Sequence, residues 1–115
     1  MQNVHYPFLP THPGHALAKK QMAAGGTIVS FEVAGGVEAA RRVVESTKLI
    51  QLAVSLGAVE SLIEIPALMS HGSYAPEARR AVGIADGLVR LSVGLEAFED
   101  LRDDLASALA AASAG

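Results

Sequence analysis

Hydrophobic and polar residues alternate in two segments of the chain, residues 27–33 and 88–93, and this two-residue period predicts β-strands. In the first segment Phe31 lies in the middle of one predicted face, and the residues of that face are Thr27, Val29, Phe31 and Val33. In the second segment one face is apolar and the other holds Leu88, Arg90 and Ser92. Glycines at 35–36 and at 94 end the two predicted strands.

A period of about 3.6 residues in the apolar positions predicts helices over residues 37–48 and 97–112. The apolar stripe of the later helix consists of Phe98, Leu101, Leu105, Leu109 and Ala112. Acidic residues at its start favour a helix N-terminus, because the helix dipole is positive there. Two shorter helices are predicted over residues 15–23, before a pair of glycines, and over residues 76–80, which begin with proline.

Two short apolar runs, residues 51–56 and 61–65, are too short for helices and are predicted to be strands. Three prolines predict that the first dozen residues are extended. The resulting order predicts an α+β two-layer sandwich, with a mostly antiparallel sheet of about four strands and helices on one face. We therefore divide the chain into an extended arm with a linking helix, residues 1–24, and an α+β domain, residues 25–115.

Composition narrows the functional classes. The 115 residues are 50% hydrophobic and 18% charged, which excludes intrinsic disorder and fits one domain. A net charge of −3 provides no basic face for nucleic acid, and the absence of cysteine excludes disulfides and thiol catalysis. No run of about 18 apolar residues predicts a membrane span. No signal pattern begins the chain, so we expect a cytoplasmic protein.

The histidines give weak evidence for chemistry. His12 and His15 are three residues apart and could share a helical face, but no third ligand lies nearby in sequence, so a surface pair is favoured over a metal site. His71 lies between Ser70 and Ser73, but a serine nucleophile also needs an orienting carboxylate and an oxyanion hole. We assign no catalytic residue and no metal ligand.

Arg90 is an arginine inside an otherwise apolar strand. Its planar guanidinium can bind a carboxylate through two parallel hydrogen bonds, or it can lie on a solvated face of the sheet. Ser55 lies near the end of the predicted strand 51–56, and like Arg90 it can be interpreted in two ways. Its hydroxyl can belong to a site or can satisfy a backbone group. From residue types alone the solvated interpretation of Arg90 is favoured.

Further stretches appear in a characteristic order and spacing, and they are residues 6–15, 25–36, 53–62, 66–71 and 83–96. Together they resemble the C-terminal part of the cystathionine γ-synthase, cystathionine γ-lyase and methionine γ-lyase family of pyridoxal-phosphate enzymes. The resemblance extends over residues 4–112 and is most specific over residues 83–96. It implies that the α+β domain is the small C-terminal domain of a longer enzyme of sulfur amino-acid metabolism.

In that family a large N-terminal domain holds pyridoxal phosphate through a Schiff-base lysine and a phosphate-binding loop. Lys19, Lys20 and Lys48 do not lie in the family's lysine motif. The resemblance therefore implies that this chain alone neither binds the cofactor nor turns over. It also implies three partners, namely the large domain, a small amino-acid substrate and further copies in a homo-oligomer.

The resemblance assigns roles to four residues. Arg90 matches the arginine that binds the substrate α-carboxylate. Ser55 and Leu56 match the stretch that lines the substrate side of the cofactor pocket. Val54 occupies a position that is acidic in some cystathionine-cleaving members, so valine favours substrates like those of methionine γ-lyase or the sulfhydrylases.

The reaction remains open between Cγ–S elimination and γ-replacement on cystathionine, methionine or O-acyl-homoserine. Two departures from the family pattern, Ser70 for threonine and Ala58 for glycine, leave the substrate undetermined. The alternative function is a stand-alone, non-enzymatic module that binds an amino acid or assembles subunits. The binding of an amino acid without cofactor would distinguish this module from a piece of an enzyme.

Overall fold

The computed structural model describes residues 1–114. Its elements are β1 (Gln2–His5), α1 (His15–Gln21), β2 (Ile28–Glu32), α2 (Gly36–Ser46), β3 (Gln51–Leu52), β4 (Leu62–Glu64), α3 (Pro76–Ala81), β5 (Leu88–Ser92) and α4 (Phe98–Ala114). The helices predicted over residues 37–48 and 97–112 are confirmed with small shifts at their ends. Gly115, the last residue of the predicted domain, lies outside the described residues.

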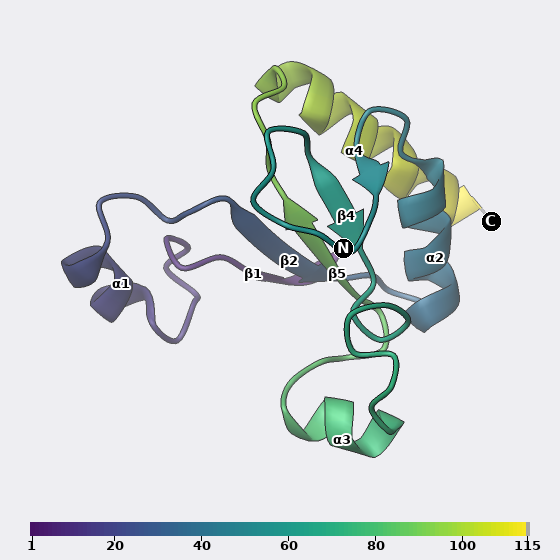
Figure 1. The fold of residues 1–115 in the computed structure, drawn as a ribbon, viewed down its shortest axis with the longest axis horizontal. Coiled ribbons are helices and arrows are strands. Elements are labelled where there is room, and N and C mark those ends of the chain that lie inside the picture. The colour runs from purple at the N-terminus through teal and green to yellow at the C-terminus, as the bar shows by residue number, and fades with distance from the viewer. Residues whose placement is uncertain (115) are drawn as a thin grey trace.

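The strands form one sheet in the order β1-β2-β5-β4-β3 (Figure 1). The first three neighbouring pairs are antiparallel, and β3 pairs with β4 in parallel. The α+β class is confirmed. The sheet has three antiparallel pairs and one parallel pair, so it is mixed, and it has five strands where about four were predicted. The connection over residues 53–61 brings the chain back in the same direction, which makes the last pair parallel.

One face of the sheet packs against α2 and α4, which lie side by side in Figure 1. Phe31, Ile63 and Val89 come from the three central strands and are almost fully buried. Both helices contribute small residues to this core, namely Ala39, Ala40, Ala108 and Ala112. Because alanines allow the helices to approach closely, the core is built with few aromatic side chains. Helices α1 and α3 lie away from this layer (Figure 1).

Two segments differ from the prediction at the edges of the sheet. Residues 2–5 of the predicted extended arm pair with β2, so the arm supplies an edge strand before its first proline. The predicted strand 51–56 is reduced to two residues, and residues 53–58 form a loop. Among the helices of residues 1–114, we find none with the length and apolar character that a membrane crossing requires.

Candidate functional site

Arg90 lies in the middle of β5, on the face of the sheet opposite α2 and α4. Its neighbours across the ladder are Ser30 on β2 and Glu64 on β4. Because side chains alternate along a strand, the burial of Val89 and Leu91 against the helices directs Arg90 to the other face. The three central strands therefore place one basic and one acidic side chain next to each other on this face.

Arg90 and Glu64 form an ion pair, with 2.5 Å between Nη2 of Arg90 and Oε2 of Glu64. The Glu64 side chain is 1% exposed and the Arg90 side chain is 20% exposed. The backbone N–H of Ser70 lies 3.4 Å from Oε1 of Glu64 as a weak second donor. Burying a carboxylate without a cationic partner is costly, so the guanidinium of Arg90 offsets the burial of Glu64. The interpretation of Arg90 as a solvated arginine was wrong.

Arg90 also holds the loop at residues 53–58. Its Nη2 donates to the carbonyl oxygen of Val54 at 2.8 Å and lies 3.4 Å from that of Ser55. Two residues further along β5, the Ser92 hydroxyl accepts a hydrogen bond from the N–H of Gly57 at 2.9 Å. Strand β5 therefore contacts this loop at two places, through Arg90 and through Ser92.

Two of the predicted site residues, Val54 and Ser55, contact Arg90 directly. Val54 and Ser55 contact it through their backbone, and the side chains of Val54 and Leu56 are 51% and 56% exposed. Within residues 1–114 the Ser55 hydroxyl makes no hydrogen bond, so it does not satisfy a backbone group. The loop therefore carries two exposed apolar residues and one serine, and its backbone contacts the guanidinium.

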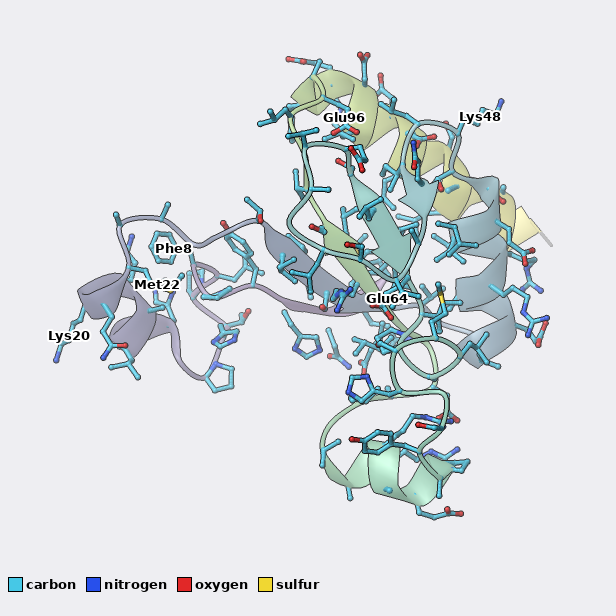
Figure 2. All side chains as sticks on the ribbon, in the orientation of Figure 1. Phe8, Lys20, Met22, Lys48, Glu64 and Glu96 are labelled. Carbon is cyan, nitrogen blue, oxygen red and sulfur yellow. The ribbon has the colours of Figure 1, made fainter. Side chains whose placement is uncertain are left out.

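The three lysines do not form a site for pyridoxal phosphate. All three are exposed, and in Figure 2 the side chains of Lys20 and Lys48 lie far from Glu64. Lys19 lies over the ring of Phe8, with its Nζ 4.5 Å from the ring centroid. The residues present do not fit the cofactor by themselves, so no step through that group is assigned to this chain.

The histidines are engaged in local contacts. Nδ1 of His12 accepts the N–H of Gly14 at 2.9 Å, and Nδ1 of His15 lies 3.1 Å from the carbonyl oxygen of Pro7. His71 contacts the hydroxyl of its neighbour Ser70 at 3.0 Å. Residues 1–114 contain no group of three or more histidine, aspartate or glutamate side chains that could hold a metal ion.

Glu64 is the site residue that sequence reasoning missed. It lies between two isoleucines in the run 61–65, which was interpreted only as an apolar strand. An acidic residue inside such a run is the signal that could have found it, because a buried carboxylate requires a partner. Its partner on β5 could be identified only from the pairing of the strands.

Comparisons with known proteins all point to one enzyme family. The family model described as Cys/Met metabolism PLP-dependent enzyme matches residues 1–110. The L-methionine gamma-lyase of Fusobacterium nucleatum subsp. polymorphum is 54% identical over 109 residues, which are 95% of this chain and 28% of that protein. The cystathionine gamma-lyase of Saccharomyces cerevisiae is 50% identical over 108 residues, which are 92% of this chain and 27% of that protein.

Solved structures give the same result. The cystathionine gamma synthase of Xanthomonas oryzae pv. oryzae in complex with cystathionine superposes with a TM-score of 0.92 at 50% identity, covering 98% of this chain and 29% of that one. The cystathionine gamma lyase CalE6 of Micromonospora echinospora superposes with a TM-score of 0.89 at 52% identity, covering 94% and 28%. The chain thus spans less than a third of the length of these similar proteins.

Proposed function

Because the chain belongs to the Cys/Met metabolism PLP-dependent enzyme family, we propose that it is the C-terminal domain of a longer enzyme that acts on sulfur amino acids. In this proposal the domain supplies the binding site for the α-carboxylate of the substrate. The observation that carries the proposal is Arg90, a partly exposed guanidinium that the sheet holds beside an exposed loop.

The comparisons support the class of substrate. The similar proteins are named for methionine and for cystathionine, and both compounds carry an α-amino acid group. We infer Cγ–S elimination or γ-replacement on cystathionine, methionine or O-acyl-homoserine. In our proposal the complete enzyme is a cytoplasmic homo-oligomer, which light scattering and cell fractionation test.

The chain's own residues orient the substrate. Arg90 binds the carboxylate through charge-assisted hydrogen bonds, which fix the position of the adjacent α-carbon. Ser55 and Leu56 line the substrate side of the pocket beside it. Pyridoxal phosphate, held by the rest of the enzyme, supplies the electron withdrawal that the reaction needs. In this division of roles the domain contributes orientation, so residues 1–115 alone are inactive.

The test uses the full-length polypeptide that carries residues 1–115, which we call the complete enzyme. Its release of 2-oxobutanoate is measured with L-methionine, L-cystathionine and O-acetyl-L-homoserine. We expect Arg90→Ala to lower kcat/KM by about 100-fold or more, the effect of removing a charged hydrogen-bond partner. The control is Arg102→Ala, because Arg102 is an exposed arginine on α4.

Two results would overturn the proposal. If the Arg90→Ala enzyme keeps its kcat/KM, Arg90 is not the carboxylate-binding residue. If residues 1–115 alone release 2-oxobutanoate, the proposed division of roles between the two parts of the enzyme is wrong. Calorimetry of residues 1–115 with the same amino acids tests the alternative function. Tight binding without cofactor would favour a stand-alone amino-acid-binding module.

A further inference from the structure

We propose that Glu64 is a positioning residue for Arg90, and that an incoming carboxylate displaces the Val54 carbonyl, while Glu64 stays in place. This inference rests on the proposed function of Arg90 and adds the residue that sets the orientation of its guanidinium. It follows from two observations. One is which nitrogen of the Arg90 guanidinium already contacts protein oxygens, and the other is how deeply Glu64 and Val54 are buried.

A guanidinium binds a carboxylate with two hydrogen bonds along one of two edges. One edge joins Nη1 and Nη2, and the other joins Nε and Nη2, so Nη2 belongs to both. In this structure Nη2 of Arg90 is the atom that contacts Glu64, Val54 and Ser55, at 2.5, 2.8 and 3.4 Å. Within residues 1–114, Nε and Nη1 have no hydrogen-bond partner.

A substrate carboxylate therefore cannot form both hydrogen bonds until one oxygen leaves Nη2. The Glu64 carboxylate is charged, almost fully buried and 2.5 Å from Nη2, and moving it would leave a buried charge without a partner. The Val54 carbonyl is neutral and belongs to an exposed loop, where water can replace Arg90 as its donor. The Val54 contact is the one that can be exchanged at low cost.

The backbone fixes Glu64 independently of Arg90. Glu64 lies at the end of β4, in register with Arg90 on β5, so the distance between the two Cα atoms is set by the ladder. Its other carboxylate oxygen faces the N–H of Ser70. The carboxylate therefore acts as a fixed stop at Nη2, and it orients the plane of the guanidinium with Nε and Nη1 available to a ligand.

The test measures binding of an unreactive amino acid to the complete enzyme. L-Norleucine and L-norleucinamide have the same side chain, and only the first has a carboxylate. Their inhibition constants are measured for the wild-type enzyme and for Glu64→Ala, Glu64→Gln and Arg90→Ala. The structural control is Ser61→Ala, since Ser61 is buried next to β4 and hydrogen-bonds to Glu96 and Gly94, away from Arg90.

We expect Glu64→Ala to raise the inhibition constant of norleucine by about 10- to 100-fold, the effect of removing one partner of a buried ion pair. The value for norleucinamide should not change, because this compound has no carboxylate for Arg90 to bind. Glu64→Gln keeps the length and one acceptor oxygen, so it should recover part of the loss. Ser61→Ala should lower the melting temperature without changing the ratio of the two inhibition constants.

The proposal is wrong if Glu64→Ala and Glu64→Gln leave the ratio unchanged while Arg90→Ala raises it. It is also wrong if Glu64→Gln and Ser61→Ala change the ratio equally, because the effect would then be structural. If Arg90→Ala itself leaves the ratio unchanged, the proposed function of Arg90 fails instead. If Glu64→Ala does not fold, the Glu64→Gln enzyme decides between these outcomes.

Discussion

Glu96 binds Ser61 at two points. Its Oε1 accepts the Ser61 hydroxyl at 2.7 Å, and its Oε2 accepts the Ser61 backbone N–H at 2.8 Å. The Ser61 hydroxyl oxygen accepts a third hydrogen bond, from the N–H of Gly94 at 2.8 Å. Because Ser61 is fully buried, this contact ties the segment before β4 to the segment after β5.

Removing the Glu96 carboxylate should destabilise the chain. In Glu96→Ala the buried hydroxyl and N–H of Ser61 lose their acceptors, and we expect the free energy of unfolding to fall by about 2 to 3 kcal/mol. Urea denaturation of the chain measures the change. Glu99→Ala is the control, because Glu99 carries an exposed carboxylate in the first turn of α4. Equal effects of the two variants would contradict the role of the Ser61 contact.

The same contact should make stability depend on pH. Two hydrogen bonds from Ser61 lower the pKa of Glu96 below its usual 4.5. The bond from the backbone N–H has the larger effect, and the bond from the hydroxyl has the smaller one. The unfolded chain therefore takes up this proton first as the pH falls. The contribution of Glu96 is fully present above about pH 5 and is lost as the pH falls through the lowered pKa of the folded chain. Urea denaturation over this range should show a shallower decline for Glu96→Gln than for the wild type.

Asp104 on α4 fixes the turn after α2. Its carboxylate accepts the backbone N–H groups of Lys48, Leu49 and Ile50 at 2.8, 2.9 and 2.9 Å. Burial raises the pKa of Asp104, but these three N–H donors outweigh burial and the pKa is lowered. We expect Asp104→Ala to cost about 2 to 3 kcal/mol in urea denaturation, and Asp104→Asn to cost less because one acceptor oxygen remains.

The control for Asp104 is its neighbour Asp103. The Asp103 side chain is mostly exposed, and among the described residues it pairs only with the adjacent Arg102. Asp103→Ala should change the free energy of unfolding by less than about 0.5 kcal/mol. If both alanine variants gave the same small change, the turn after α2 would not depend on Asp104.

Local periodicity predicted much of the fold. The alternation around Phe31 and Leu91 predicted β2 and β5, because one face of each strand is buried against helices. The stripe of α4 predicted the longest helix. Strand β1 has no such pattern, since all its residues are exposed at the edge of the sheet. The direction of β3 depends on the path of residues 53–61, which periodicity does not describe.

The candidate site was predictable in part. Arg90 could be selected as a charged residue in an apolar strand, but its environment depends on β4 and on the loop at residues 53–58. The loop was predicted as strand because its apolar residues suggest burial, whereas Val54 and Leu56 are exposed. Arg90 and Val54 are 36 positions apart, and a pattern of neighbouring residues cannot predict a contact between them. The role of Arg90 toward a substrate stays a prediction.

Gly94 lies against the backbone of the segment before β4. A Cβ added at Gly94 would collide with the carbonyl oxygen of Val59 and would lie 2.6 Å from the carbonyl carbon of Glu60. We expect Gly94→Ala to lower the free energy of unfolding by about 3 kcal/mol or more, because backbone atoms must move. Gly36→Ala is the control, since Gly36 has positive φ and open space around it. It should cost only about 1 to 2 kcal/mol of backbone strain.

Val54 allows a test of substrate choice in the complete enzyme. Its side chain is exposed on the loop that Arg90 holds, so Val54→Glu can place a carboxylate there without disturbing the core. Cystathionine carries a second ammonium group at its far end and methionine does not, so a carboxylate that reaches this end should favour cystathionine over methionine. We expect kcat/KM for cystathionine relative to methionine to rise by about three- to tenfold, as a partly exposed ion pair allows. Val82→Glu, at an exposed position after α3, should leave the ratio unchanged. An unchanged ratio in Val54→Glu would mean that this side chain does not reach the far end of the substrate.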